Sequence, residues 1–190
     1  MTAAAAARPP AQIRRLLPGE WAAVREVRLD ALSRAPDAFA STLEREQAFD
    51  QQEWRRRLAT TAYFGAWPAG PAPRLAGMVA TFPETGPQAP AMQHATPGTW
   101  HLVAMWVSPE HRGQGMADQL VAAVCDLARA RGAGQVALWV ADANPRARAV
   151  YQRLGFRLSG ERGILRPAAP GQAALEEARM TLRLRGRPAS

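Results

Sequence analysis

A glycine-rich loop between an apolar strand and an amphipathic helix constrains this chain more than any other feature. The loop is Arg112-Gly-Gln-Gly-Met-Ala117; the apolar run 102–107 precedes it, and a helical pattern covers 115–131. A strand that turns through such a loop into a helix leaves several backbone N–H groups without partners, and the helix dipole adds partial positive charge at the same point. The sequence therefore predicts a phosphate-binding site here.

The segments around this loop predict an α/β domain. Apolar residues recur at helical spacing after it, and residues 136–141 are apolar on both faces, as in a central strand. Asn144 and Pro145 form a helix start, with Asn as the N-cap and Pro at the first helical position. The two strands that flank the first helix should be parallel through a right-handed crossover. The loop and Asn144 then lie at the same end of neighbouring strands, where open sheets bind ligands.

Hydrophobic patterns place further strands and helices along the rest of the chain. We expect strands at 11–17, 99–107, 156–159 and 180–184, a hairpin of 63–67 with 75–82, and helices at 18–33, 47–60 and 145–154. The proline-rich residues 83–98 and residues 162–177 are expected to form loops.

With 190 residues, the chain is most simply one domain that spans residues 11–187 after a disordered tail at 1–10. The longest apolar runs fall far short of a membrane span, so no membrane partner is expected. Cys125 is the one cysteine, which excludes an intrachain disulfide. It falls among apolar helix positions and is expected to be a buried, inert thiol. These features fit a cytoplasmic protein.

The net charge of +8 invites a nucleic-acid interpretation. However, all 24 basic residues are Arg, a bias that together with the abundant Ala indicates genome-wide codon usage. The chain has no aromatic-basic interleaving and no recognisable nucleic-acid motif, so no nucleic-acid partner is expected. Half of the 16 acidic residues lie at 20–53, whereas Arg outnumbers them from Arg112 onward. This asymmetry fits either two sites of opposite charge preference or solvated helix faces.

Two common phosphate-binding motifs fit the loop poorly. A Walker A loop needs Gly-Lys-Ser/Thr, and the chain contains no Lys. A dinucleotide fingerprint needs a third glycine three positions after Gly115, and that position is Asp118, whose charge and bulk oppose a nucleotide phosphate. A Gly-x-Gly by itself is also compatible with a simple turn, so the loop alone does not identify a ligand.

Two spaced motifs carry a resemblance to a known family. Residues 107–117, Val-Ser-Pro-Glu-His-Arg-Gly-Gln-Gly-Met-Ala, resemble the acetyl-CoA signature of the GCN5-related N-acetyltransferases, which is Gln/Arg-x-x-Gly-x-Gly/Ala after a strand that ends Val-x-Pro. Residues 144–156 resemble the second element of that family, with Asn144, Tyr151 and Gly155 in the expected order. One helix and one strand separate the two motifs, as in that family, and the pair is much more specific than either motif alone.

The resemblance implies the fold of that family, abbreviated GNAT: a mixed central sheet of six to seven strands flanked by about four helices. It also implies acetyl-CoA as co-substrate, and no metal. The loop N–H groups would hold the CoA pyrophosphate, the edge of the preceding strand would bond the pantetheine arm as an added strand, and Asn144 would contact that arm. Arg148 either reaches a CoA phosphate or lies on a solvated face. The implied cofactor-binding residues are Met105, Trp106, Val107, Arg112, Gly113, Gln114, Gly115, Met116, Ala117 and Asn144.

Acetyl transfer needs a neutral amine, stabilisation of the oxyanion and a proton for the departing thiolate. By position, Tyr151 resembles the family's general acid. Some members carry a basic Glu on the strand before the loop, which is absent here, and ribosomal-protein alanine acetyltransferases carry one five residues before the Asn, where this chain has Trp139. His101 on that strand is the best candidate for the base. Glu44, Glu46 and water are the alternatives.

The sequence thus predicts an N-acetyltransferase that moves an acetyl group from acetyl-CoA to a primary amine of a small molecule or a protein N-terminus, by direct attack in a ternary complex. The acidic segment at 20–53 would suit a cationic acceptor, and the resemblance leads us to expect a homodimer. The missing carboxylate base motivates one alternative, a non-catalytic acyl-CoA-binding regulatory protein on the same fold.

Overall fold

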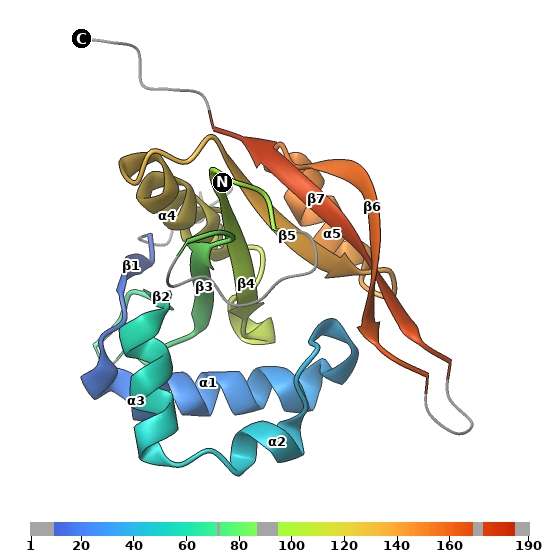
Figure 1. Cartoon of the computed structure of the whole chain (residues 1–190). Helices are drawn as coiled ribbons and strands as arrows, with labels where there is room; N and C mark the ends of the chain where they lie inside the picture. The colour runs from blue at the N-terminus through green and yellow to red at the C-terminus, as the bar shows by residue number, and fades with distance from the viewer. Residues whose placement is uncertain (1–9, 72, 87–94, 169–172, 185–190) are drawn as a thin grey trace, which may run out of the picture.

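Seven strands form one mixed sheet in the order β1-β2-β3-β4-β5-β7-β6 (Figure 1). The computed structural model describes residues 10–71, 73–86, 95–168 and 173–184. The strands are β1 Gln12–Arg15, β2 Ala62–Trp67, β3 Gly77–Pro83, β4 Thr99–Val107, β5 Gln135–Ala141, β6 Arg157–Arg166 and β7 Leu175–Arg183. The helices are α1 Trp21–Arg34, α2 Leu43–Gln47, α3 Gln51–Thr60, α4 Met116–Ala130 and α5 Pro145–Arg153, and three 3-10 turns are η1 Pro18–Glu20, η2 Pro36–Ala38 and η3 Pro109–His111.

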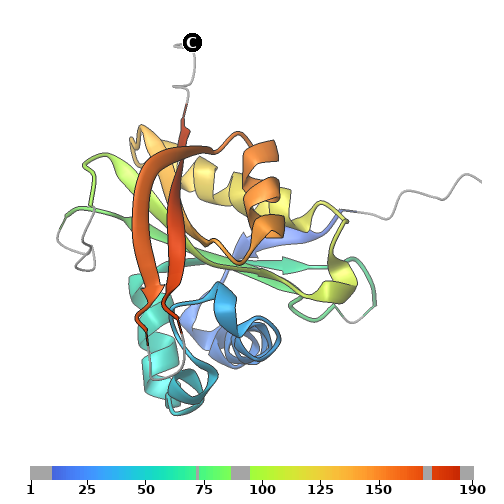
Figure 2. The same cartoon turned by 90° about the vertical axis from the view of Figure 1, so that its right-hand side faces the viewer.

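Helices lie on both faces of this sheet (Figure 2). We call the face under α4 and α5 the back face; its core includes Leu120 and Met180. The opposite face, which we call the front face, packs against α1 and α3 around Trp54 and Met78. The mixed α/β sheet is the architecture that the sequence predicts, with five α-helices where about four were expected.

The parallel pair β4 and β5 separates half-way along its length. Its register runs from Thr99 opposite Gln135 only as far as His101 opposite Ala137. All the other neighbouring strands in the sheet are antiparallel. The second half of β4 therefore presents an edge to β5 that is not paired with it, and this opening lies in the middle of the sheet.

A β-bulge in β4 accompanies the separation. Met78 of β3 pairs with Trp106 and Ala80 pairs with Val103, so two residues of β4 lie opposite one residue of β3. One of the two, Ala104, has φ of +54°, in the left-handed region that residues with a side chain rarely adopt. Such strained residues are found most often where a site must be held in a defined geometry.

The segments with strong local signals fold as predicted. β4 has the predicted bounds, 99–107, and β2 and β3 form the predicted antiparallel hairpin. The Asn144 side chain accepts a hydrogen bond from the N–H of Ala147 at 3.0 Å and begins α5. The tail expected at 1–10 lies almost wholly outside the described residues. Among the described helices, none is long and apolar enough to cross a membrane.

Two predicted segments are wrong. The helix expected at 47–60 begins only at Gln51, because Asp50 accepts a hydrogen bond from the N–H of Glu53 at 2.8 Å and caps α3; residues 43–47 form the separate helix α2, which the sequence did not predict. Half of the residues expected as a loop at 162–177 are strand, since β6 continues to Arg166 and β7 begins at Leu175. Most of β6 is exposed, so its residues show no alternation of apolar and polar side chains, and its pairing with β7 alone makes it a strand.

Candidate active site

The glycine-rich loop forms an open cradle at the start of α4. Gly113 and Gly115 have φ of +74° and +76°, and a Cβ atom added to Gly113 would meet no atom within 4 Å. The first hydrogen bond of the helix joins the N–H of Gln119 to the carbonyl of Gly115 at 3.1 Å. The preceding N–H groups, such as that of Ala117, therefore have no acceptor within the helix. This arrangement can bind an anion through backbone donors.

Arg112 fastens this cradle to the end of β4. Its Nε donates a hydrogen bond to the carbonyl of Val107 at 3.0 Å, and its Cζ lies 4.8 Å from the ring centroid of Trp106. Gln114 donates from Nε2 to the carbonyl of Glu110 in η3 at 3.3 Å. These two predicted site residues thus hold the loop in place, and the surface of the cradle is backbone.

The start of α5 lies at the end of β5, beside the opening between β4 and β5. Asn144 caps the helix, and its own N–H donates to the carbonyl of Ala141 at 2.9 Å. Arg148 forms an ion pair with Asp142 at 2.7 Å. Arg148, the arginine that the sequence offered for a phosphate contact, is therefore engaged by a neighbouring carboxylate.

Tyr151 points into the core on the back face. It is 7% exposed, and its ring meets Phe156 edge-on with 5.6 Å between centroids. Burial raises the pKa of the Tyr151 hydroxyl above its ordinary value. The phenol therefore stays protonated at neutral pH, which is the state that a proton donor needs.

His101 lies in a buried polar network that the sequence did not predict. The side chain is 4% exposed, its Nδ1 is hydrogen-bonded to Glu84 at 2.9 Å, and its ring stacks on Phe82. Glu84 also accepts hydrogen bonds from Arg179 at 2.6 and 2.8 Å, and Arg179 in turn binds Glu161. The network joins the residue after β3 to β4, β6 and β7, and no short motif marks it. The role of His101 as a base stays a prediction.

The two glutamates proposed as alternative bases form no hydrogen bond or ion pair with the described residues of this network. Glu46 is 1% exposed and receives two hydrogen bonds from Arg28, at 2.8 and 2.9 Å. Burial alone would raise the pKa of Glu46, but the bonds from Arg28 hold it below its usual range. Glu44 is exposed on α2. Glu46 thus serves as the partner of a buried cation between α1 and α2.

The acidic segment at 20–53 is largely neutralised. Six of its eight carboxylates lie within 4.0 Å of an arginine: Glu20, Glu26, Asp30, Asp37, Glu46 and Glu53. Asp50 caps α3. Arginines therefore offset most of the negative charge of this segment. That the segment attracts a cationic acceptor stays a prediction.

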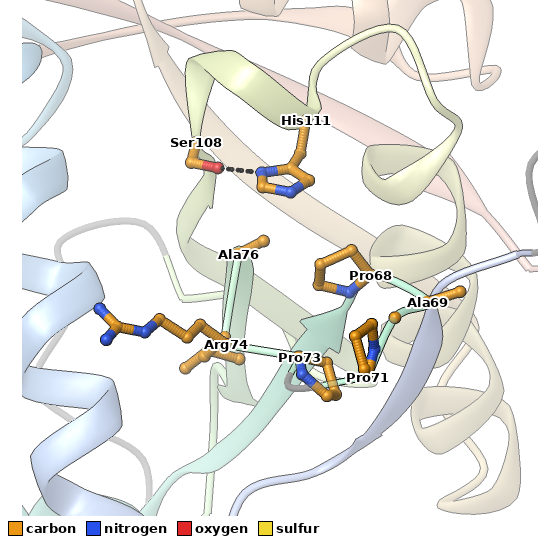
Figure 3. Close-up of a pocket in the computed structure, with 10 residues that line it drawn as sticks. Pro68, Ala69, Pro71, Pro73, Arg74, Ala76, Ser108 and His111 are labelled. Carbon is orange, nitrogen blue, oxygen red and sulfur yellow. Dashed lines mark hydrogen bonds between the residues drawn. The ribbon is translucent and has the colours of Figure 1, made fainter.

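A hollow of about 380 Å³ lies beside the cradle, between the β2–β3 connection and η3 (Figure 3). Its lining includes Pro68, Pro73, Ser108 and His111, and the hydroxyl of Ser108 is hydrogen-bonded to Nδ1 of His111 at 2.8 Å. The pair resembles a nucleophile and base, but within the described residues no carboxylate is hydrogen-bonded to the imidazole. Ser108 instead begins η3. The hollow flanks the predicted site and contains none of its residues.

Comparison with known proteins decides the family. A model of the acetyltransferase (GNAT) family matches residues 21–156, which include the cradle, Asn144 and Tyr151. The chain belongs to the GNAT family of acetyltransferases. The segment of this GNAT protein that matches the family model contains the glycine loop, the separation of β4 from β5 and the capped start of α5.

Relatives of this GNAT chain span a wide range of identity. N-acetyltransferase 8F1 of Rattus norvegicus is 32% identical over 125 residues, which cover 58% of this chain and 54% of that protein. The chain thus spans about half the length of this curated relative. A phosphinothricin acetyltransferase from Sinorhizobium meliloti, solved in complex with acetyl-CoA, has a TM-score of 0.72 at 19% identity, covering 96% of this chain and 93% of that one. A GNAT acetyltransferase from Streptococcus pneumoniae has a TM-score of 0.70 at 18% identity, covering 92% and 99%. These two structures share the fold.

Proposed function

We propose that this GNAT protein is an N-acetyltransferase that transfers the acetyl group of acetyl-CoA to a primary amine of a small molecule or a protein N-terminus. The observation that carries the proposal is the open cradle of Gly113 and Gly115, which lies at the end of the β4 edge that β5 leaves unpaired. The CoA pyrophosphate would lie at the cradle, and the pantetheine arm of the same molecule would extend from it along that edge.

The residues present fit acetyl-CoA. The space above Gly113 would be filled by any Cβ atom, as expected where backbone must approach a phosphate closely. The N–H groups from Gly113 to Ala117 would hold the pyrophosphate, and the edge at Met105–Val107 would bond the pantetheine arm. That the related Sinorhizobium meliloti protein was solved with acetyl-CoA supports this assignment.

Acetyl-CoA supplies an acetyl thioester, whose carbonyl carbon accepts the amine as its bond to sulfur breaks. An ammonium R–NH3⁺ then becomes the amide R–NH–acetyl and loses two protons. One of the two balances the thiolate, which leaves as CoA–SH, and the other goes to solvent. Backbone N–H groups of β4 at Met105–Val107 would stabilise the negative charge that develops on the carbonyl oxygen.

Tyr151 is the proposed general acid. Its raised pKa keeps the hydroxyl protonated, so the residue can donate to the thiolate and recover a proton afterwards. Several candidates remain for the general base that deprotonates the amine. Engagement of Glu46 by Arg28 argues against that residue, while His101 has a carboxylate partner but little exposure. Water also serves this role for an amine of low pKa.

A non-catalytic acyl-CoA-binding protein is the second candidate. The observation that favours it is Trp139, which stands on β5 where ribosomal-protein alanine acetyltransferases carry a glutamate. Such a protein would bind acetyl-CoA as tightly as an enzyme and show no turnover. A homodimer, the absence of nucleic-acid and membrane partners, and a cytoplasmic location stay predictions.

Two measurements on the full chain test the proposal. Calorimetry should show binding of acetyl-CoA, and a thiol reagent should detect release of CoA with at least one member of an amine panel, such as spermidine, cadaverine and an alanine-initiated peptide. Burial raises the pKa of Cys125 to about 11, so the protein's own thiol should add little background. Absence of both binding and release would exclude the proposal, and binding without release would favour the second candidate.

A further inference from the structure

Glu177 is an unpaired carboxylate in a chain where arginine neutralises almost every other one. All but three of the 16 acidic residues lie within 4.0 Å of an arginine in the described part of the chain. Of the three, Glu44 is exposed and Asp50 is an exposed helix cap. Glu177 is partly buried in the sheet, and no described residue forms an ion pair or a hydrogen bond with its carboxylate. A carboxylate in such a place indicates a ligand of positive charge.

The nearest arginine along the strand is already engaged. Arg179 lies two residues after Glu177 on β7, so both side chains are on the same face of the sheet. The guanidinium of Arg179 is held by Glu84 at 2.6 Å and by Glu161 at 2.9 Å. The buried network around His101 thus keeps this cation away from Glu177 and leaves the carboxylate unneutralised.

Trp139 and a glycine complete a small seat around Glu177. A Cβ atom added to Gly163 on β6 would lie 3.1 Å from Cζ3 of Trp139 and 3.3 Å from Oε1 of Glu177. The ring and the carboxylate therefore both pack over Gly163, and a larger residue there would push them aside. An aromatic ring beside a carboxylate is a favourable environment for an ammonium group, which both attract.

The seat lies where an acceptor must approach. β7 pairs Glu177 with Ala141 at the end of β5, just before Asn144. The pairing of β5 with β4 ends at Ala137. Trp139, two residues later, lies on the same face of the sheet as Ala137 and is therefore beside the opening. α4 and α5 cover the back face, so an amine reaches the opening between β4 and β5 from the front face, past this seat (Figure 2).

We propose that Trp139 and Glu177 bind the ammonium group of the acceptor, which is therefore a primary amine that arrives protonated. This inference rests on the proposed acetyl transfer and names the part of the site that recognises the amine. Glu177 takes one of the two protons that the ammonium loses and passes it to solvent. The other balances the CoA thiolate through Tyr151, so the reaction as a whole releases one proton.

The environment of Glu177 suits this role. Burial raises the pKa of its carboxyl above the ordinary value, so the carboxylate is a better base than an exposed one. The charged groups that share its surroundings are Arg179 and Glu161, which are bound to each other, and Arg166, which reaches η2 through the carbonyl of Pro36 and the carboxylate of Asp37. None of these groups is paired with Glu177.

Replacing Glu177, and separately its neighbour Glu176, distinguishes loss of amine binding at the seat from a general effect of removing a carboxylate from β7. E177Q should lower kcat/KM for the amine about 100-fold, with unchanged acetyl-CoA binding by calorimetry. E176Q is the matched control, because Glu176 is an exposed partner of Arg162 on the other face of β7, and it should stay within about twofold of wild type. E177D should recover part of the loss. The fall of wild-type kcat/KM at acid pH, where Glu177 becomes protonated, should disappear in E177Q.

A second variant tests the seat without changing a charge. G163A places a methyl group against Trp139 and Glu177, and it should raise KM for the amine several-fold while acetyl-CoA affinity stays the same. Equal kcat/KM values for wild type, E177Q and G163A would overturn the seat and leave the acetyltransferase assignment intact.

A binding probe distinguishes failure of the seat from failure of the proposed function. If wild type releases no CoA with any amine, the proposed function is wrong, and n-butylammonium then tests the seat directly against 1-butanol by saturation-transfer NMR. Preference for the ammonium in wild type and its loss in E177Q would support the seat. Equal binding of the two probes would overturn it.

Discussion

Asp118 on α4 accepts two hydrogen bonds from Arg153 on α5, at 2.6 and 2.7 Å. The sequence places Asp118 in the first turn after the glycine loop, where its charge argues against a bound phosphate. Arg153 comes from a helix 35 residues away and offsets that charge. The hydrogen bonds from Arg153 also lower the pKa of the Asp118 carboxyl. The cradle therefore keeps the backbone donors of α4 and carries little net negative charge beside them.

This pair predicts a coupled effect on acetyl-CoA affinity. R153A exposes the charge of Asp118 to the pyrophosphate and should weaken acetyl-CoA binding about threefold to tenfold at low salt. The double variant D118N/R153A should restore most of the affinity, since the repulsive charge is gone. Calorimetry at two salt concentrations measures both effects. A double variant as weak as R153A would show that the arginine, and not the aspartate, sets the affinity.

The cradle itself predicts a contrast between two glycines. Gly113 and Gly132 flank α4, have φ of +74° and +76°, and have open space where a Cβ atom would go. G113A and G132A should each destabilise the fold by about 1–2 kcal/mol, because alanine is strained in this region. G113A alone should weaken acetyl-CoA binding about tenfold or more through loss of a charge-assisted contact. Thermal unfolding and calorimetry check the two expectations, and equal affinities would remove the cradle from the site.

Local signals explain which parts of the fold could be predicted. β4 is an apolar run ended by Ser108-Pro109, and α5 has an Asn144 cap and a closing glycine, so both are predicted within a residue or two. β6 is an exposed edge strand whose partner lies far along the chain, and its sequence carries no such signal. The spacing of apolar residues within one segment predicts a helix or a strand. Pairing between two strands that are distant in the chain cannot be predicted from the sequence of either strand alone.

The same distinction applies to the candidate site. The glycine loop and Asn144 belong to compact motifs, and the sequence predicts both. Glu84 and Arg179 meet because residues after β3 and on β7 come together in the folded sheet, and Glu177 lies near Trp139 because β7 pairs with β5, so no spacing along the chain relates them. Residues that act through tertiary contacts are therefore visible only once the sheet order is known.

Tyr151 predicts a specific loss of rate. Y151F keeps the ring against Phe156 and removes only the hydroxyl, so kcat should fall about 100-fold or more while acetyl-CoA affinity and stability change little. Y63F is the matched control, since Tyr63 is the other tyrosine and is equally buried on β2, in the front-face core. Because burial raises the pKa of Tyr151, wild-type kcat should not fall at alkaline pH before about pH 10. Equal rates for the two variants would exclude Tyr151 as the acid.

The network of Glu84, His101 and Arg179 predicts a dependence of stability on acid pH. Burial tends to raise the pKa of Glu84, but hydrogen bonds from His101 and the backbone N–H of Thr96, together with the charge of Arg179, hold it below the ordinary value. A folded-state pKa below the unfolded one stabilises the fold above the unfolded value of 4.5, and this stabilisation disappears as pH falls through the folded pKa.

E84Q should therefore destabilise the protein by about 3–5 kcal/mol at pH 7, because it leaves the buried Arg179 without a full counter-charge. The difference between E84Q and wild type should shrink as pH falls below 4.5, since Glu84 itself becomes neutral. Urea unfolding at pH 7 and pH 4 measures both values, with E176Q as an exposed control that stays near wild type. A constant difference between E84Q and wild type across this range would mean that packing, and not the charge of Glu84, holds the three strands together.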